Sequence, residues 1–293
     1  MKILITGTSG FVGKKLAKSL EDLDHDVIGI DFKKDKKYTT LNLDISSQDF
    51  LNNFNIKGIE IIFHLAAQSG GYKSLEDPYI DSLWNCVGTA NMISLAKKLN
   101  IKKFIFISSM AIYGNGKRVT ENTIPKPISF YGVSKLSGEL QTKLLFEHNK
   151  INFTIFRLFA TYGSGQDLEN KHQGILSIYL SQILNSDEIK ITGSKSRRRE
   201  LVHINDVINA LIMGLKKETN NKTYNVTNNE KITPEIIINE ISRQLNKKVK
   251  IVELDGYEGD QTFITSEKSA LSKLGWEPSF NLNLGVKEFI TNI

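Results

Sequence analysis

The sequence predicts an α/β protein with a doubly wound parallel sheet and a smaller C-terminal α/β region. Apolar runs of the kind that form strands buried on both faces alternate with amphipathic runs typical of helices. A glycine-rich turn joins the first of these strands to the first helix. Sheets of this kind bind their ligands beyond the carboxyl ends of the strands, so the strand ends are the places to look for function.

The predicted elements follow one another regularly through the N-terminal half of the chain. Strands are predicted at residues 1–6, 27–30, 59–65, 103–109 and 153–159. Helices are predicted between them at residues 14–20, 82–99 and 133–149. After about residue 163 the pattern loosens, with helices expected at 174–184, 234–245 and 284–290. A strand at 222–226 is a candidate to return to the first sheet.

The length allows one large domain or two closely joined ones, because 293 residues can bury a sizeable core. We expect a first domain at residues 1–165, joined by later segments near 200–227. A smaller region then covers residues 166–293.

Composition narrows the class of protein. The chain has no apolar run of the roughly 18 residues that a membrane span needs, and its N-terminus reads as a strand rather than a signal peptide. We therefore expect a cytoplasmic protein with no membrane partner. The single cysteine, Cys86, excludes an intramolecular disulfide and a cysteine-based metal cage, and we expect no metal site. The net charge of +6 comes mostly from scattered lysines, so we expect no nucleic-acid partner.

The turn after the first strand has the spacing of a dinucleotide fingerprint. Gly7, Gly10 and Gly13 stand where glycine lets the backbone turn tightly and approach a pyrophosphate. Three spaced glycines can also form a plain strand–helix turn. The second strand, however, ends in Asp31, whose carboxylate can bond the adenosine ribose and repel a 2′-phosphate. The combination predicts a Rossmann domain that binds NAD rather than NADP, although a pair of lysines follows shortly after Asp31.

Tyr131 and Lys135 lie four residues apart in a helix-forming stretch, so their side chains share one helix face. A free phenol titrates near pH ~10 and is a poor base at neutral pH. A lysine ammonium alongside favours the phenolate, and the pair can then move a proton to or from a sugar hydroxyl. The same spacing also occurs on solvated helix faces. The functional interpretation of the pair therefore depends on the dinucleotide fingerprint upstream.

Ordered motifs along nearly the whole chain indicate one family. The motifs are Gly7-x-x-Gly10-x-x-Gly13, Asp31, Asp44-Ile45, His64-Leu65-Ala66-Ala67, Asn85-x-x-Gly88-Thr89, Ser108-Ser109-Met110-Ala111-Ile112-Tyr113-Gly114, Tyr131-x-x-x-Lys135, Arg157-Leu158-Phe159-x-x-Tyr162-Gly163, Arg199-Glu200-Leu201-Val202-His203-Ile204-Asn205-Asp206-Val207 and Leu274-Gly275-Trp276-Glu277-Pro278. With these motifs the chain resembles the extended short-chain dehydrogenase/reductases. Within them it is similar to the NAD-dependent nucleotide-sugar epimerase/dehydratase group, which includes UDP-glucose 4-epimerase.

The resemblance implies NAD as the cofactor and assigns residues to it. Asp44 and Ile45 would hold the adenine, although Asp44 could instead cap a helix that starts near Ser46. Ala66 and Ala67 would pack closely against the cofactor. The implied cofactor-binding residues are Gly7, Ser9, Gly10, Phe11, Val12, Gly13, Asp31, Asp44, Ile45, Leu65, Ala66, Ala67, Asn85, Ser108, Tyr131 and Lys135.

The resemblance also implies a catalytic set. Tyr131 matches the general base, and Lys135 matches the lysine that bonds the nicotinamide ribose and lowers the tyrosine pKa. Ser109 matches the serine or threonine that bonds the reacting hydroxyl, although Ser108 could equally be the hydrogen-bonding residue.

The family's epimerases pass a hydride from sugar C4 to NAD⁺ and return it to the other face of a 4-keto sugar. Dehydratase relatives place an acidic residue just after the catalytic serine or threonine, whereas this chain has Met110 and Ala111 there. The resemblance therefore implies C4 epimerisation of an NDP-hexose, in cell-surface polysaccharide precursor synthesis. A 4-keto-sugar reductase or dehydrogenase and a non-catalytic NAD-binding regulator remain as alternatives.

Substrate contacts are expected mainly from residues 166–293, which would bind the nucleotide-sugar. Gln173, Gly174 and Arg199 match residues that meet the substrate diphosphate, although Arg199 also ends a short basic run. The loop Gln68-Ser69-Gly70 follows the cofactor strand and would lie over the sugar. Ser109 would also contact the sugar.

Three departures from the family pattern bear on which sugar is bound. Ala160 replaces an asparagine that contacts the nucleotide-sugar in many relatives, Tyr257 falls where a second diphosphate arginine is common, and Ser164 replaces a proline. The family habit also implies a homodimer, with the helices at 82–99 and 133–149 as its seam.

Overall fold

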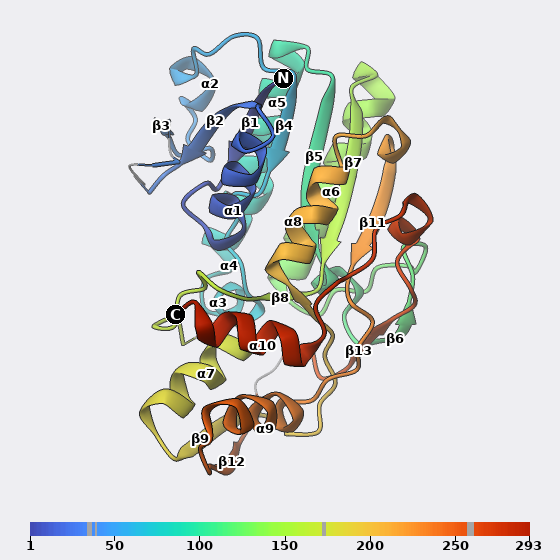
Figure 1. Ribbon diagram of the computed structural model, residues 1–293. Helices are drawn as coiled ribbons and strands as arrows, with labels where there is room; N and C mark the ends of the chain where they lie inside the picture. The colour runs from blue at the N-terminus through green and yellow to red at the C-terminus, as the bar shows by residue number, and fades with distance from the viewer. Residues whose placement is uncertain (34–36, 39, 172–173, 257–260) are drawn as a thin grey trace.

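The structure is a computed structural model and describes residues 1–33, 37–38, 40–171, 174–256 and 261–293. A seven-stranded parallel sheet forms its centre (Figure 1). Its strands are β1 (Lys2–Thr6), β2 (Asp26–Asp31), β3 (Leu41–Asn42), β4 (Ile61–His64), β5 (Lys103–Ser109), β7 (Asn152–Leu158) and β11 (Lys222–Val226). They lie in the order β11-β7-β5-β4-β1-β2-β3, which confirms the predicted doubly wound fold.

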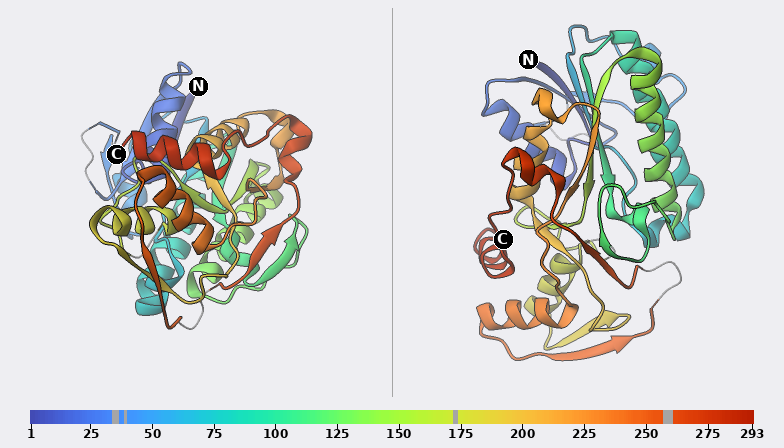
Figure 2. Two further views of the ribbon diagram at one scale, coloured as in Figure 1. Left: turned by 60° about the horizontal axis from the view of Figure 1, so that its bottom comes forward. Right: turned by 90° about the vertical axis from the view of Figure 1, so that its right-hand side faces the viewer.

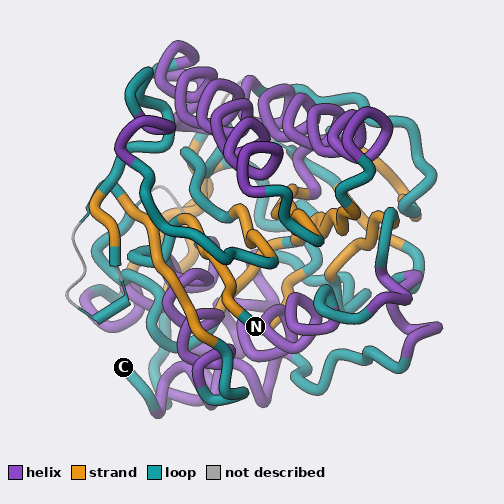
Figure 3. Tube along the Cα trace, turned by 90° about the horizontal axis from the view of Figure 1, so that it is seen from above, coloured by secondary structure: helices purple, strands orange, loops and turns teal. Residues whose placement is uncertain are grey.

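Helices cover both faces of this sheet, as the right-hand view of Figure 2 and the view from above in Figure 3 show. One face carries α1 (Phe11–Glu21) and α8 (Ile204–Met213), and the other carries α5 (Gly88–Leu99) and α6 (Phe130–Asn149). Along β5, Ile105 and Ile107 pack toward the first pair of helices, whereas Phe104 and Phe106 pack toward the second. Burial on both faces explains why apolar residues follow one another without alternation in strands such as β1, β4 and β5.

The helix predicted at 82–99 begins earlier, at Pro78. The Asp77 side chain accepts a hydrogen bond from the backbone N–H of Ile80, and proline fits the first helical position. The helix continues as α4 (Pro78–Ser82), a π-helical turn η1 (Leu83–Val87) and α5. A π-turn inside a helix is uncommon and often occurs at a functional site.

The C-terminal region forms its own core beyond the carboxyl ends of the strands (Figure 1). Its helices are α7 (Ile175–Asn185), α9 (Pro234–Leu245) and α10 (Leu282–Thr291), and its strands are β9 (Glu188–Thr192) and β12 (Lys250–Leu254). Short parallel pairs join it to the first part: β8 (Ala160–Tyr162) with β10 (Leu201–His203), and β6 (Gly116–Val119) with β13 (Ile264–Ser266).

The remaining helical elements are short: α2 (Phe50–Asn53), α3 (Gly71–Glu76), η2 (Met110–Tyr113), η3 (Lys217–Thr219) and η4 (Ala270–Leu274). Within the described ranges, none of the helices has both the length and the apolar character that crossing a membrane requires.

Candidate active site

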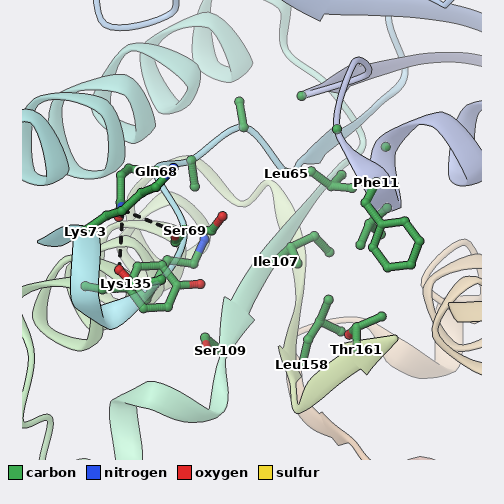
Figure 4. Close-up of a pocket in the computed structure, with 18 of the residues that line it drawn as sticks. Phe11, Leu65, Gln68, Ser69, Lys73, Ile107, Ser109, Lys135, Leu158 and Thr161 are labelled. Carbon is green, nitrogen blue, oxygen red and sulfur yellow. Dashed lines mark hydrogen bonds between the residues drawn. The ribbon is translucent and has the colours of Figure 1, made fainter. Parts of the chain in front are cut away.

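A cavity of about 770 Å³ lies along the carboxyl ends of the strands and extends to the start of α7. Figure 4 shows Phe11, Leu65 and Ile107 on one side of it and Gln68, Ser69 and Lys135 on the other. The predicted site residues that line it are Gly7, Ser9, Gly10, Phe11, Val12, Gly13, Asp31, Asp44, Ile45, Leu65, Ala66, Ala67, Gln68, Ser69, Gly70, Ser108, Ser109, Tyr131, Lys135, Ala160, Gly174 and Arg199. Gln173 lies outside the described residues.

The glycine turn forms one end of the cavity and suits a dinucleotide pyrophosphate. Gly7 has φ +80°, and a Cβ there would lie 2.9 Å from the Ala66 backbone nitrogen, so only glycine fits between the two strand ends. Gly10 is the N-cap of α1 and, being glycine, has no side chain with which to cap that helix. The amides of the first turn are therefore available to an anionic group, which the helix dipole also favours.

The Asp31 carboxylate is held in place at the end of β2. Its Oδ2 accepts a hydrogen bond of 2.9 Å from the Ser9 backbone N–H, and its Oδ1 accepts one of 2.9 Å from the Lys33 backbone N–H. The carboxylate thus lies beside the glycine turn, where an adenosine ribose is bound in this fold.

Asp44 lines the same end of the cavity but caps no helix near Ser46. Its Oδ1 accepts hydrogen bonds from the Ser46 backbone N–H, at 2.8 Å, and from the Ser46 hydroxyl, at 2.7 Å. The Asp44 carboxylate therefore stabilises a local turn. The next helix, α2, begins only at Phe50. The expectation of a helix start near Ser46 is therefore wrong.

Asn85 does not line the cavity, although we predicted it as a cofactor contact. Its Oδ1 accepts from the Gln68 backbone N–H at 2.7 Å, and its Nδ2 donates to the Gln68 carbonyl oxygen at 3.1 Å. The same Nδ2 lies 2.9 Å from the Ser134 hydroxyl and 3.1 Å from the buried Asp81 carboxylate. Asn85 thus holds the loop after β4, and burial raises the pKa of the Asp81 carboxyl beside it.

A chain of buried hydrogen bonds through Thr6, His64 and Thr89 holds the backbone that follows β4. Thr6 Oγ1 accepts from the backbone N–H groups of Leu65 and Ala66, so its proton goes to His64 Nδ1, 2.8 Å away. His64 Nε2 then donates to Thr89 Oγ1 at 3.0 Å. Burial lowers the pKa of His64 to about 3, so the ring stays neutral and this arrangement does not change over the physiological pH range.

Ser109, Tyr131 and Lys135 come together near the middle of the cavity. Ser109 ends β5, and α6 begins one residue before Tyr131, with Ser129 as its N-cap. The Ser109 hydroxyl lies near the Tyr131 phenol, close enough to lower its pKa. Lys135 is 4% exposed, and its Nζ lies 4.8 Å from the centre of the Phe106 ring.

The pKa values of this group differ from the expectation of a lowered phenol pKa. Burial raises the pKa of Tyr131 to about 12, while the neighbouring Ser109 hydroxyl acts in the opposite direction. Burial also lowers the pKa of Lys135 to about 8, against the attraction of the Asp81 and Glu139 carboxylates. In the protein alone, desolvation therefore favours the neutral form of both groups.

A buried ion pair lies behind this group, and we did not predict it. Glu139 accepts hydrogen bonds from Arg157 at 2.9 and 2.8 Å, and both side chains are almost fully buried. The Ser108 hydroxyl donates to Glu139 Oε1 at 2.6 Å, so Ser108 serves this network and Ser109 is the serine beside Tyr131. Glu139 follows Lys135 by four residues, a spacing that could have indicated it.

The far end of the cavity is formed by the C-terminal region. Gly174 has φ +91° and is the N-cap of α7, and a Cβ there would lie 2.2 Å from Gln166 Nε2. Arg199 is 7% exposed and is fixed by two backbone hydrogen bonds to Ile232 across a short antiparallel bridge. A helix N-terminus and a guanidinium at one end of a cavity suit a diphosphate. Tyr257 lies outside the described residues.

The model of the NAD dependent epimerase/dehydratase family matches residues 3–227. The chain belongs to this family. As a member of this NAD-dependent family the protein uses NAD, and the glycine turn, the start of α1 and Asp31 form a site that fits it.

Relatives of known name lie within the same family. The chain is 30% identical to a Methanocaldococcus jannaschii protein provisionally assigned as a UDP-glucose 4-epimerase, over 98% of this chain and 97% of the relative. It resembles the UDP-glucose 4-epimerase of Thermotoga maritima solved with UDP-glucose, with a TM-score of 0.93, 26% identity, and 100% and 98% coverage. It also resembles the Bacillus cereus UDP-glucuronic acid 4-epimerase solved with UDP-glucuronic acid and NAD, with a TM-score of 0.89, 25% identity, and 100% and 98% coverage.

Proposed function

We propose that the protein interconverts the C4 epimers of a nucleotide-diphosphate hexose with NAD as a permanently recycled cofactor. The observation that carries the proposal is one continuous cavity with Asp31 at one end, Arg199 at the other and the Ser109–Tyr131–Lys135 group between them. Such a cavity can hold a dinucleotide and a nucleotide-sugar end to end. The similarity to solved structures of UDP-sugar 4-epimerases supports the same assignment.

Residues of the chain itself transfer the proton of the sugar 4-hydroxyl. Tyr131 takes the proton of the sugar 4-hydroxyl as the C4 hydrogen leaves as hydride, and it returns the proton when the hydride comes back to the other face. Ser109 donates a hydrogen bond to the same oxygen, and Lys135 holds positive charge beside the phenolate. Bound NAD supplies the hydride acceptor, and its positive ring opposes the effect of burial on the Tyr131 pKa.

The residues after Ser109 favour epimerisation over dehydration. Met110 and Ala111 line the cavity in the short helix η2, and neither side chain can accept or donate a proton. Removing water from the sugar needs such a group near C5 and C6. We therefore infer that sugar C4 is oxidised and then reduced again, and that no water is eliminated.

Substrate contacts are proposed for the remaining lining residues. Gly174, with Gln173 before it, and Arg199 would bind the diphosphate through the start of α7 and a guanidinium. The sugar would lie against the loop Gln68-Ser69-Gly70 and Ala160, as the cavity lining supports.

We also propose a homodimer through α5 and α6. The outer face of α6 carries Val133, Leu140 and Leu144, each about half exposed, and Val87 is similarly exposed at the end of η1. Three apolar residues at spacings of seven and four form a stripe of the kind that packs against another helix.

The division at residue 165, the cytoplasmic location and the link to polysaccharide synthesis stay predictions.

One experiment tests the proposed function. The protein is purified, its bound cofactor is released and identified, and the enzyme is incubated with UDP-, dTDP-, GDP- and CDP-hexoses. Isomerisation with no net change in cofactor is the expected result. Stoichiometric consumption of NAD or NADH would instead assign the protein as a reductase or dehydrogenase.

A further inference from the structure

Two aromatic rings outside the predicted site lie at the adenosine end of the cavity. Phe32 and Trp84 line it together with Asp31, Asp44 and Ile45. The ring centres of Phe32 and Trp84 are 5.2 Å apart and the ring planes are inclined by 40°. Neither residue belongs to the glycine turn or to the catalytic group, so the function proposed above does not use them.

The two rings come from different elements that are each held firmly. Phe32 follows Asp31, whose carboxylate is bonded on both sides, at the end of β2. Trp84 lies in the π-turn η1 directly before Asn85, whose amide is fixed to the Gln68 backbone. The wider π-turn allows Trp84 to reach the cavity while Asn85 faces the buried side. The pair is thus anchored at its backbone.

The exposure of Phe32 leaves an aromatic face open to a ligand in the cavity. Phe32 is 53% exposed, although a phenyl ring gains free energy by leaving water. The ammonium of Lys33 lies 5.9 Å from the centre of the same ring, on a residue whose backbone bonds Asp31. A flat, weakly polar heterocycle that carries no charge of its own matches such a surface.

We propose that Phe32 and Trp84 form an aromatic clasp for the adenine of NAD. The rings pack against the faces and edges of the base, while Asp31 bonds the ribose. The clasp requires only that NAD binds. Where the enzyme also returns its hydride to the same sugar, as proposed above, the clasp keeps the cofactor bound between turnovers.

The chain offers a direct optical test, because it has two tryptophans and only Trp84 lines the cavity. Trp276 is 4% exposed in the core, where its Nε1 donates to the Asp206 carbonyl oxygen at 3.1 Å. Titration of cofactor-stripped protein with ADP, which carries the adenine without the nicotinamide, should quench tryptophan fluorescence. The quench should vanish in Trp84→Phe, which retains an aromatic ring and should keep an affinity close to that of the wild type.

Truncation of either ring measures the strength of the clasp. Base–aromatic stacking predicts that Trp84→Leu and Phe32→Leu each weaken binding of NAD and of ADP by about tenfold and speed NAD release to match. The control Tyr79→Leu removes an aromatic ring that is 72% exposed on the same long helix and outside the cavity lining, and it should change neither affinity.

Two results would overturn the clasp. One is wild-type affinity for NAD and ADP in folded Trp84→Leu and Phe32→Leu, with folding checked by circular dichroism. The other is an ADP titration of the unmodified protein that saturates with no change in Trp84 fluorescence, which needs no variant at all. Neither result depends on which sugar is epimerised, so failure of the clasp and failure of the proposed function remain distinct.

Discussion

At the scale of single residues, the site places a tyrosine, a serine and a lysine where burial governs their charge. Burial raises the pKa of Tyr131 and lowers that of Lys135, and both groups lie at the centre of the cavity. Proton transfer through this tyrosine therefore depends on positive charge nearby, which Lys135 provides from within the chain and the cofactor adds when bound.

Removing the phenolic oxygen tests the role of Tyr131. Tyr131→Phe should lower turnover by at least ~10²-fold, because the ring remains but the proton acceptor is lost. NAD binding should stay near the wild-type value, since the adenosine end of the cavity is unchanged. The measurement is the initial rate of C4 isomerisation beside an NAD titration. Turnover close to normal in this variant would rule out Tyr131 as the base.

Buried Lys135 should make the stability of the cofactor-free protein depend on pH. Its pKa falls from an ordinary value of 10.5 to about 8 in the folded state, so the unfolded chain binds more protons between these two values. Stability should therefore rise with pH across this window. Urea unfolding at pH 7.5 and 9.5 should show the wild type gaining free energy of unfolding relative to Lys135→Met. A difference that stays constant or reverses would contradict this account of Lys135.

At the scale of elements, β5, β7 and α6 are joined by a buried network of Ser108, Arg157 and Glu139. Ser108 on β5 and Arg157 on β7 both donate to Glu139 on α6. These bonds tie the strand that ends in Ser109 to the helix that carries Tyr131 and Lys135. The Glu139–Arg157 pair thus sets the spacing of the catalytic group, although neither Glu139 nor Arg157 lines the cavity.

Breaking this pair should cost much more than breaking a surface pair. Glu139→Gln leaves the Arg157 charge buried with its partner removed, and should lower the free energy of unfolding by about 3–5 kcal/mol. The control Lys18→Gln removes the exposed pair with Asp22 and should change stability little. Urea unfolding of both variants provides the comparison. Similar losses in the two would show that the buried pair contributes no more than a surface one.

At the scale of the whole molecule, one sheet edge gathers strand ends that are distant in the sequence. Parallel strands place all their carboxyl ends together, so Asp31, Ala66 and Ser109 could be predicted as neighbours from the sequence. The spacing from Lys135 places Glu139 on the same helix face, but the partners of Glu139 and Asn85 could not be predicted, because they depend on how the helices lie on the sheet. Trp84 was missed because a π-turn alters which residues of a helix face the cavity.

The proposed dimer also belongs to this scale. Leu140→Glu combined with Leu144→Glu places charges on the apolar stripe of α6 and should convert a dimer into monomers. Both side chains are about half exposed in the single chain, so the fold itself should persist. Light scattering coupled to gel filtration gives the mass. A monomeric mass for the unmodified protein would contradict the proposed dimer.

The most direct test of the central claim follows the hydrogen at C4. A nucleotide-hexose deuterated at C4 is incubated with the enzyme in ordinary water, and its C4 epimer is isolated. The account predicts an epimer that retains the deuterium at C4, with no net NADH formed, because the same hydride leaves and returns within one cavity. Loss of the deuterium to solvent, or its accumulation in free NADH, would contradict the account.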